Sequence, residues 1–146
     1  SEEVRLLMDR TKESLMLGIK AAMNGNTVGD IGHAVETYCE QFGYGVVREL
    51  CGHGIGREMH ERPDIPNYGR PHSGDRLQPG MCICIEPMIT LGKRQIYIEN
   101  DGWTIHTKDR LPAAHYEHQL IITDKGTEVI SSYKQIGEVL GTNELY

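Results

Sequence analysis

The chain has 146 residues, of which 38% are hydrophobic and 25% are charged, and its formal net charge is −6. This length suits one domain with a real core and is too short to expect two. The negative charge gives no electrostatic reason to bind nucleic acid or an anionic membrane, and no apolar stretch approaches the length of a membrane span. The four cysteines lack the spacing of a zinc knuckle or a redox pair, so we expect reduced thiols and a cytoplasmic protein.

Two helices are expected first. Apolar residues recur at helical spacing from about Glu2 to Met23, and Asn24-Gly25 is a left-handed stop signal. Thr27 to Asp30 is a variant of the capping box and predicts a second helix, which ends at Gly43. The helical pattern begins at once after Ser1, without an initiator methionine, so we expect the chain to be cut from something longer.

From Gly45 onward, short apolar runs alternate with turn-forming residues. Gly52 to Gly56 is expected to be a tight turn, and Pro63 to Gly80 a loop. Helices followed by an antiparallel-leaning sheet place the chain in the α+β class. We expect residues 1–133 to form one unit and residues 134–146 a C-terminal tail with at most a helical turn. The expected strands are 46–50, 81–89, 95–99, 104–107, 115–123 and 128–131.

Three residues stand out as candidate metal ligands. His53 lies among glycines, Glu86 ends an apolar strand, and Glu117 precedes another strand. One imidazole and two carboxylates suit a divalent cation and leave room for a bound water, which indicates hydrolysis. Strand parity puts Glu86 on the same face as Cys82 and Cys84, where a charge is costly unless it is paired or bound to metal. Taken singly, Glu86 could cap a sheet edge and Glu117 could be surface charge.

The glycine-rich segment allows a rival interpretation. Three glycines at alternate positions from Gly52 to Gly56 could form a phosphate-binding loop, but no Lys-Ser or Lys-Thr follows them. Seven residues after His53 comes His60. Its imidazole could donate a hydrogen bond to a substrate carbonyl, or it could only anchor the loop that begins at Pro63.

Five segments resemble type I methionine aminopeptidase in order and spacing over most of the chain: 52–63 (GHGIGREMHERP), 77–81 (LQPGM), 85–88 (IEPM), 101–104 (DGWT) and 116–118 (YEH). The resemblance implies the pita-bread fold, in which two similar α+β halves enclose a dinuclear metal site. It implies two divalent ions, which can be cobalt, manganese, iron or zinc. The implied reaction is hydrolysis of the peptide bond after an N-terminal methionine by a metal-activated water.

The resemblance also implies a ligand scheme. His53 and Glu86 would bind one ion, and Glu117 would bridge both. The family's site needs two further aspartates and another histidine from the first half of the pita-bread, and no segment of this chain matches that half. We therefore expect a C-terminal half of the catalytic domain, inactive until a complementary N-terminal half supplies the remaining groups.

By the same resemblance, His60 would be catalytic, because it would hydrogen-bond the scissile amide and help to stabilise the tetrahedral intermediate. Met59 and Trp103 would line the methionine pocket. The implied partners are the N-termini of nascent peptides. Prolidase and proline aminopeptidase share the fold and the ligand set, and a non-catalytic pita-bread module that binds protein or RNA is a further alternative. The segments 101–104 and 116–118 fit methionine aminopeptidase better.

Overall fold

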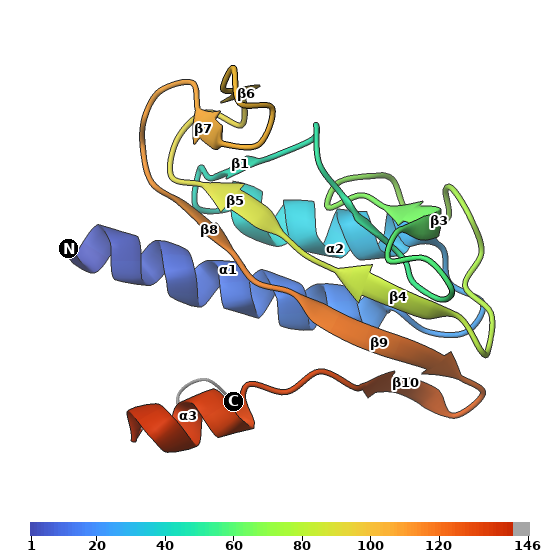
Figure 1. Ribbon diagram of the computed structural model, residues 1–146. Helices are drawn as coiled ribbons and strands as arrows, with labels where there is room; N and C mark the ends of the chain where they lie inside the picture. The colour runs from blue at the N-terminus through green and yellow to red at the C-terminus, as the bar shows by residue number, and fades with distance from the viewer. Residues whose placement is uncertain (142–146) are drawn as a thin grey trace.

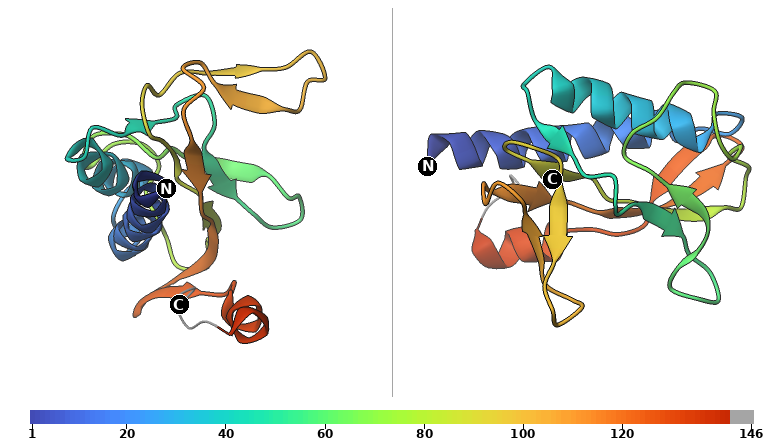
Figure 2. Two further views of the ribbon diagram at one scale, coloured as in Figure 1. Left: turned by 90° about the vertical axis from the view of Figure 1, so that its left-hand side faces the viewer. Right: turned by 90° about the horizontal axis from the view of Figure 1, so that it is seen from above.

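The computed structural model describes residues 1–141, in which two helices pack against one side of antiparallel strands (Figure 1). Figure 2 shows the helices as one layer, with the strands beside them and a β-hairpin projecting away. This arrangement confirms the α+β class. The elements are α1 (Glu2–Ala21), α2 (Val28–Glu40), β1 (Gly45–Val46), β2 (Gly52–Gly54), β3 (Glu61–Ile65), β4 (Cys82–Ile85), β5 (Met88–Thr90), β6 (Ile96–Ile98), β7 (Ile105–Thr107), β8 (Ala113–His115), β9 (His118–Thr123), β10 (Gly126–Val129) and α3 (Lys134–Leu140).

Helix α1 is capped at its start and packs closely against α2. The Ser1 hydroxyl accepts a hydrogen bond from the backbone N–H of Val4 at 3.4 Å, which satisfies a donor that the helix itself leaves free. Leu15 is fully buried on the inner stripe. A Cβ built on Gly18 would lie 3.0 Å from Cγ2 of Val35 on α2, so the absent side chain permits the close approach.

Helix α2 begins as the sequence predicts. The Asp30 carboxylate accepts hydrogen bonds from the backbone N–H of Thr27 at 2.7 Å and from its hydroxyl at 2.8 Å, within a capping box. Helix α1 ends at Ala21, two residues before the expected Met23. Gly25 then adopts a positive φ of 89°, the left-handed turn that the sequence indicates.

The strands form two sheets and a hairpin, and every pair is antiparallel. One sheet has the order β10-β9-β4-β2-β3, the second has the order β1-β5-β8, and β6 pairs with β7. Two clusters of buried side chains lie between strands and helices. The larger contains Leu15, Ile19, Ala22, Val28, Ile31, Ile65, Leu77, Ile83, Ile85, Leu120 and Ile122, and the smaller contains Leu7, Val35, Cys39, Tyr44, Val46, Ile89 and Ala114.

The predicted tight turn at Gly52 to Gly56 is wrong, because Gly52–Gly54 forms β2, an inner strand of the larger sheet. These glycines serve close packing between strands. A Cβ on Gly52 would lie 2.2 Å from the carbonyl oxygen of Cys84, and a Cβ on Gly54 would lie 2.3 Å from that of Arg62. The sequence shows the glycines but not the neighbouring strands that exclude a side chain.

The predicted loop from Pro63 to Gly80 begins too early, since Pro63 belongs to strand β3. This strand lies at the edge of the five-stranded sheet, where a residue without an N–H is tolerated. The remaining strands lie near their predicted positions with shorter or shifted bounds. The strand expected at 46–50 is reduced to Gly45–Val46, and the runs 81–89 and 115–123 are each divided into two strands.

The C-terminal segment contains α3, which Figure 1 shows beyond β10, away from α1 and α2. With seven residues, this helix is longer than the single helical turn expected after residue 133. Residues 142–146 of the expected tail lie outside the described part, and the division at residue 133 stays a prediction. Within residues 1–141, no helix combines the length and the apolar character needed to cross a membrane.

Burial of Cys39 predicts a loss of stability at high pH. The side chain is fully buried, and this burial raises the pKa of the Cys39 thiol from its ordinary 9.0 to about 11. Between about pH 9 and pH 11, the folded state therefore keeps the thiol proton that the unfolded chain loses. The corresponding stability is present below pH 9 and is lost as the pH rises towards 11, by about 2 to 3 kcal/mol. The free energy of unfolding in urea should fall less between pH 8 and pH 10.5 for Cys39→Ala than for the parent chain. An equal fall in both proteins would contradict the prediction.

Candidate metal centre

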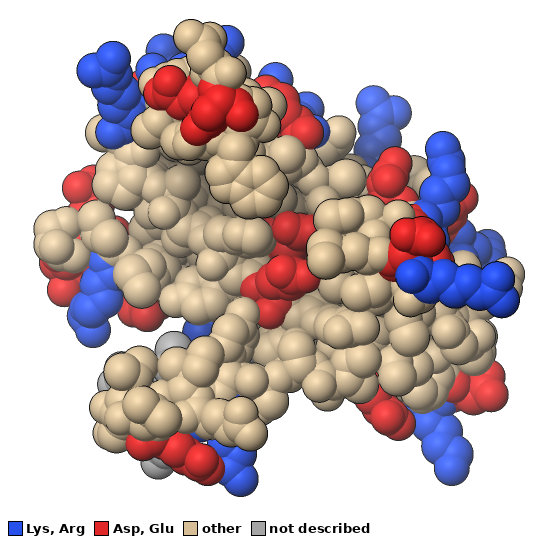
Figure 3. Space-filling model, in the orientation of Figure 1, with Lys and Arg blue, Asp and Glu red and all other residues tan. Residues whose placement is uncertain are grey.

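The structure brings the three predicted ligands together from neighbouring strands. His53 lies on β2, Glu86 follows β4, and Glu117 precedes β9, and β4 runs between β2 and β9. The Nε2 atom of His53 is 3.6 Å from Oε1 of Glu86. Both side chains are largely buried, with 13% and 14% of their surfaces exposed. Figure 3 shows acidic atoms in a hollow near the middle of this face, surrounded by uncharged side chains.

Glu86 and Glu117 lie where two neighbouring strands are both interrupted. β4 pairs with β9 as far as Ile85 and His118, and β5 pairs with β8 from Met88 and His115 onward. The residues between these pairs, 86–87 on one strand and 116–117 on the other, leave the ladder. Pro87 has no N–H to contribute to it. The sequence predicts two unbroken strands here, and the breaks explain why both glutamates lie at the same level of the sheet.

Side chains satisfy the carbonyl groups that the breaks leave unpaired. The amide of Asn67, a fully buried residue, donates to the Glu86 carbonyl oxygen at 3.1 Å. The Tyr133 hydroxyl donates to the Glu117 carbonyl oxygen at 2.9 Å. Because buried backbone groups are costly when unpaired, these two contacts stabilise the irregular backbone at both carboxylates.

The His53 ring is oriented for metal binding. Its Nδ1 atom lies 2.9 Å from the carbonyl oxygen of Gly54, which can only accept, so Nδ1 carries the proton. This leaves the lone pair of Nε2 directed towards the carboxylates, as in many metal-bound histidines. The ring of His60 contacts that of His53 edge-on, with centroids 4.3 Å apart. His60 therefore lies beside the predicted ligands.

Two further donors lie within the same cluster. The Nε2 atom of His115 is 3.2 Å from Oε2 of Glu86. The thiol of Cys84 is 3% exposed and donates a hydrogen bond to Glu117. Burial raises the pKa of the Cys84 thiol to about 12, and the hydrogen bond and the negative charges of Glu117 and Glu86 act in the same direction. The alternation of side chains along a strand predicts that Cys84 shares a face with Glu86 and that His115 shares a face with Glu117. It does not show which of these side chains lie close enough to bind a cation.

The donors form two groups that share Glu117. In each group, one donor atom per residue can be chosen such that all three lie within 4.8 Å of one another. One group is His53, Cys84 and Glu117, and the other is Glu86, His115 and Glu117. Carboxylates, imidazoles and a thiol at this separation fit a divalent cation such as zinc, whose bonds to oxygen and nitrogen are about 2.0–2.2 Å long.

Two cavities adjoin these donors. The first, of ≈390 Å³, contains the three predicted ligands in its wall together with Met59 and His60. The second, of ≈520 Å³, shares His60 and Glu86 with the first and is lined mainly by apolar groups such as Leu50 and Met88. Met59 is 70% exposed at the rim.

Trp103 is not brought to either of these cavities. It lies in the turn between β6 and β7, at the end of the projecting hairpin, and its side chain is 87% exposed. Asp101 shapes this turn by accepting hydrogen bonds from the backbone N–H groups of Trp103 and Thr104, both at 2.9 Å. The structure thus does not place Trp103 against either cavity, and its contact with a methionine side chain stays a prediction.

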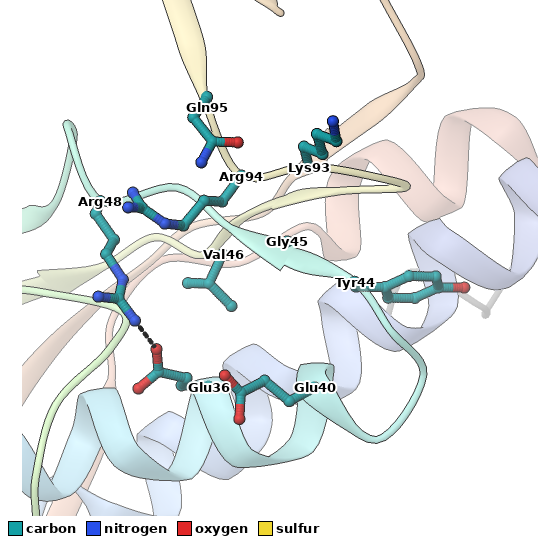
Figure 4. Close-up of a pocket in the computed structure, with 9 residues that line it drawn as sticks. All are labelled: Glu36, Glu40, Tyr44, Gly45, Val46, Arg48, Lys93, Arg94 and Gln95. Atoms are coloured by element: carbon teal, nitrogen blue, oxygen red, sulfur yellow. Dashed lines mark hydrogen bonds and ion pairs between the residues drawn. The ribbon is translucent and has the colours of Figure 1, made fainter. Parts of the chain in front are cut away.

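A cavity of ≈440 Å³ between α2 and the segment around β1 has a different character (Figure 4). Its charged residues are of both signs, and Arg48 forms an ion pair of 2.7 Å with Glu36. Figure 4 shows Arg94 and Glu40 on opposite walls. This cavity lacks the combination of imidazole and carboxylates found beside β4, so it is not a candidate metal site.

The sequence model of Metallopeptidase family M24 matches residues 1–124. The chain belongs to this family. A methionine aminopeptidase of Clostridium acetobutylicum is 47% identical over 131 residues, which cover 90% of this chain and 52% of that protein. A methionine aminopeptidase of Escherichia coli is 44% identical over 124 residues, covering 85% of this chain and 47% of that protein. The chain thus spans about half the length of these M24 relatives.

Solved structures confirm that this M24 chain has the fold of a pita-bread half-domain. A methionine aminopeptidase from Rickettsia prowazekii superposes with a TM-score of 0.86 at 39% identity, covering 88% of this chain and 52% of that one. An Xaa-Pro dipeptidase from Bacillus anthracis gives 0.65 at 27% identity, covering 89% and 31%. The M24 chain therefore resembles methionine aminopeptidase more closely than this dipeptidase, in agreement with the segments 101–104 and 116–118.

Proposed function

We propose that the chain is the C-terminal half of a methionine aminopeptidase, which removes the N-terminal methionine from nascent peptides in the cytoplasm. The observation that carries the proposal is the convergence of His53, Glu86 and Glu117 on one cavity. The identity of 42–47% to several proteins named methionine aminopeptidase supports the choice of reaction. A prolidase-type activity is less well supported, because the dipeptidase structure is less similar.

Each residue has a defined task in this proposal. His53, Glu86 and Glu117 hold two divalent cations together with ligands from elsewhere, and cobalt, manganese, iron or zinc would serve. Such a pair of ions supplies an activated water and polarises the scissile carbonyl. His60 contributes a hydrogen-bond donor beside that carbonyl, where negative charge develops in the transition state.

The apolar cavity beside Glu86 provides a place for the methionine side chain. Its lining is mainly uncharged, and it opens next to His60, so a side chain inside it would leave the scissile bond close to the imidazole. Met59 contributes a flexible apolar wall at the rim of the neighbouring cavity. We assign the same substrate-binding role to Trp103, which would close over the methionine from the hairpin.

The half-molecule proposal follows from the incomplete site. The chain spans about half of the M24 relatives, and the family resemblance implies two aspartates and a histidine that are not among its matching segments. Met59, at the rim of the cavity that contains the three ligands, is 70% exposed. We propose that a complementary N-terminal half covers this rim, supplies the missing groups and makes the assembly active, whereas the chain alone is inactive.

Reconstitution tests this function. The complementary half can be the part of the Clostridium acetobutylicum relative that lies outside the matched stretch, co-expressed with this chain and loaded with cobalt or manganese. Release of methionine from Met-Ala-Ser is expected only from the pair, and an X-Pro peptide should remain intact. A stable, metal-loaded pair that releases no methionine would refute the assigned reaction, and activity of the chain alone would refute its dependence on a partner.

His60→Ala should separate chemistry from metal binding. Because His60 is assigned to the substrate and not to the ions, the variant should keep its metal content while the reconstituted kcat falls by roughly 10² to 10³. His33→Ala is the matched control, since His33 is an exposed histidine on α2 far along the chain from the cavity. Loss of metal from His60→Ala would show that His60 is a ligand instead.

A further inference from the structure

The buried thiol of Cys84 is held between two of the assigned metal ligands. Strand β4 lies between β2 and β9, and Cys84 is the register partner of His53 on one side and of Gln119 on the other. Register partners on antiparallel strands project from the same face of a sheet. Cys84 therefore shares a face with the His53 imidazole, and backbone pairing on both sides fixes its position.

The donor atoms around Cys84 have the spacing of a small metal site. Its sulfur, a nitrogen of His53 and a carboxylate oxygen of Glu117 can all lie within 4.8 Å of one another. Around a tetrahedral zinc ion, such donors are separated by about 3.5 Å. Because the His53 Nδ1 atom is engaged with Gly54, the nitrogen available for a cation is Nε2.

We propose that Cys84 is itself a metal ligand, and that His53, Cys84 and Glu117 form a three-donor site for a zinc-like divalent cation within this chain alone. The proposal deepens the metal centre described above and rests on it. Binding breaks the S–H bond and forms a metal–sulfur bond, and the proton passes to the buffer without any change of oxidation state. The fourth position is left to water or to a group from the substrate.

The thiol gives this site a preference among metals. Thiolate donors favour zinc and cobalt, whereas manganese and magnesium favour oxygen donors. The group formed by Glu86, His115 and Glu117 contains no sulfur, so it provides an internal contrast a few ångströms away. Zinc or cobalt should therefore occupy the Cys84 side first when the chain binds a single ion.

Cobalt(II) is the probe, because a cobalt–thiolate bond produces a charge-transfer band in the near ultraviolet that oxygen and nitrogen donors do not produce. We expect this band to rise with the first equivalent of cobalt added to the chain under anaerobic, reducing conditions. Cys84→Ser should lack the band and bind cobalt at least about tenfold more weakly, the minimum cost of losing even an outer-shell partner. Cys82→Ser is the matched control on the same strand and should retain both properties, as should Cys51→Ser and Cys39→Ser.

The outcomes separate ligation by Cys84 from the proposed His53, Glu86 and Glu117 centre on which it rests. Cobalt binding without a charge-transfer band would overturn ligation by Cys84 and leave the His/Glu/Glu centre intact. No cobalt binding at all would overturn a three-donor site within this chain alone, whereas the centre completed by a complementary half is tested by the reconstitution described above. A band that survives in Cys84→Ser, or that disappears in Cys82→Ser, Cys51→Ser or Cys39→Ser, would assign the sulfur to another cysteine. Should Cys84→Ser fail to fold, the band of the parent chain and its survival in the three other variants decide the assignment.

Discussion

Replacing Glu117 with glutamine should abolish high-affinity cation binding by the chain. Glu117 is the one residue shared by both donor groups, so its loss leaves two donors in each. An amide keeps the shape of the side chain but removes the negative charge that compensates the cation. We expect the affinity for zinc or cobalt to fall by about 100-fold or more, at the upper end of the effect of removing a supporting partner. Isothermal titration calorimetry measures this directly.

Glu128→Gln is the control for this experiment. Glu128 is an exposed carboxylate on β10, so its substitution removes the same charge from the same protein at a distance from the cavity. Its affinity should match that of the parent chain. Equal affinities for Glu117→Gln and the parent would show that Glu117 does not bind the cation, and equal losses in both variants would indicate only a general effect of net charge.

Replacing Ile85 with alanine should produce the largest loss of stability. Ile85 is fully buried in the larger core cluster, at the end of β4 directly before Glu86. A Cβ built on Gly18 of α1 would lie 3.4 Å from Cγ2 of Ile85, which shows how closely the strand meets the helix. Truncation leaves a cavity at this contact and should lower the free energy of unfolding by about 3 to 4 kcal/mol, as measured by urea denaturation.

Ile98→Ala provides the comparison, because Ile98 is 56% exposed in the hairpin and loses little buried surface when it is truncated. Its effect should stay within about 0.5 kcal/mol. A small effect of Ile85→Ala, comparable to that of Ile98→Ala, would mean that β4 does not pack against α1 as described. Because Glu86 follows Ile85 directly, cation affinity should also weaken in Ile85→Ala at concentrations of urea that leave Ile98→Ala unaffected.

The three candidate ligands could be singled out from the sequence because their signals are local. His53 lies among glycines, and the two glutamates end or precede apolar runs, so each position can be recognised from a few neighbouring residues. The role of the glycines was not predictable in the same way. Gly52 is needed because the Cys84 carbonyl oxygen lies against it, and this contact exists only once β2 and β4 are paired.

The strand breaks show a second limit of sequence patterns. The runs 81–89 and 115–123 are apolar enough to predict continuous strands, and Pro87 is the only local sign of an interruption. The interruption at Glu117 has no local sign in the sequence. It accompanies the interruption of the neighbouring strand at Glu86 and contacts such as the hydrogen bond from the Tyr133 hydroxyl. Cys84 and His115 went unassigned for the same reason. Parity gives the face of a strand, but it does not show which side chains across the sheet lie close enough to share a cation.

Diffraction from crystals of the zinc-loaded chain, recorded on both sides of the zinc absorption edge, tests the metal centre most directly. We predict an anomalous peak in the cavity beside β4, at about 2.0–2.2 Å from Nε2 of His53 and from a carboxylate oxygen of Glu117. Glu86 should lie in the first coordination shell of this ion or of a second one. A fully occupied zinc ion elsewhere, with no peak between His53, Glu86 and Glu117, would contradict the account.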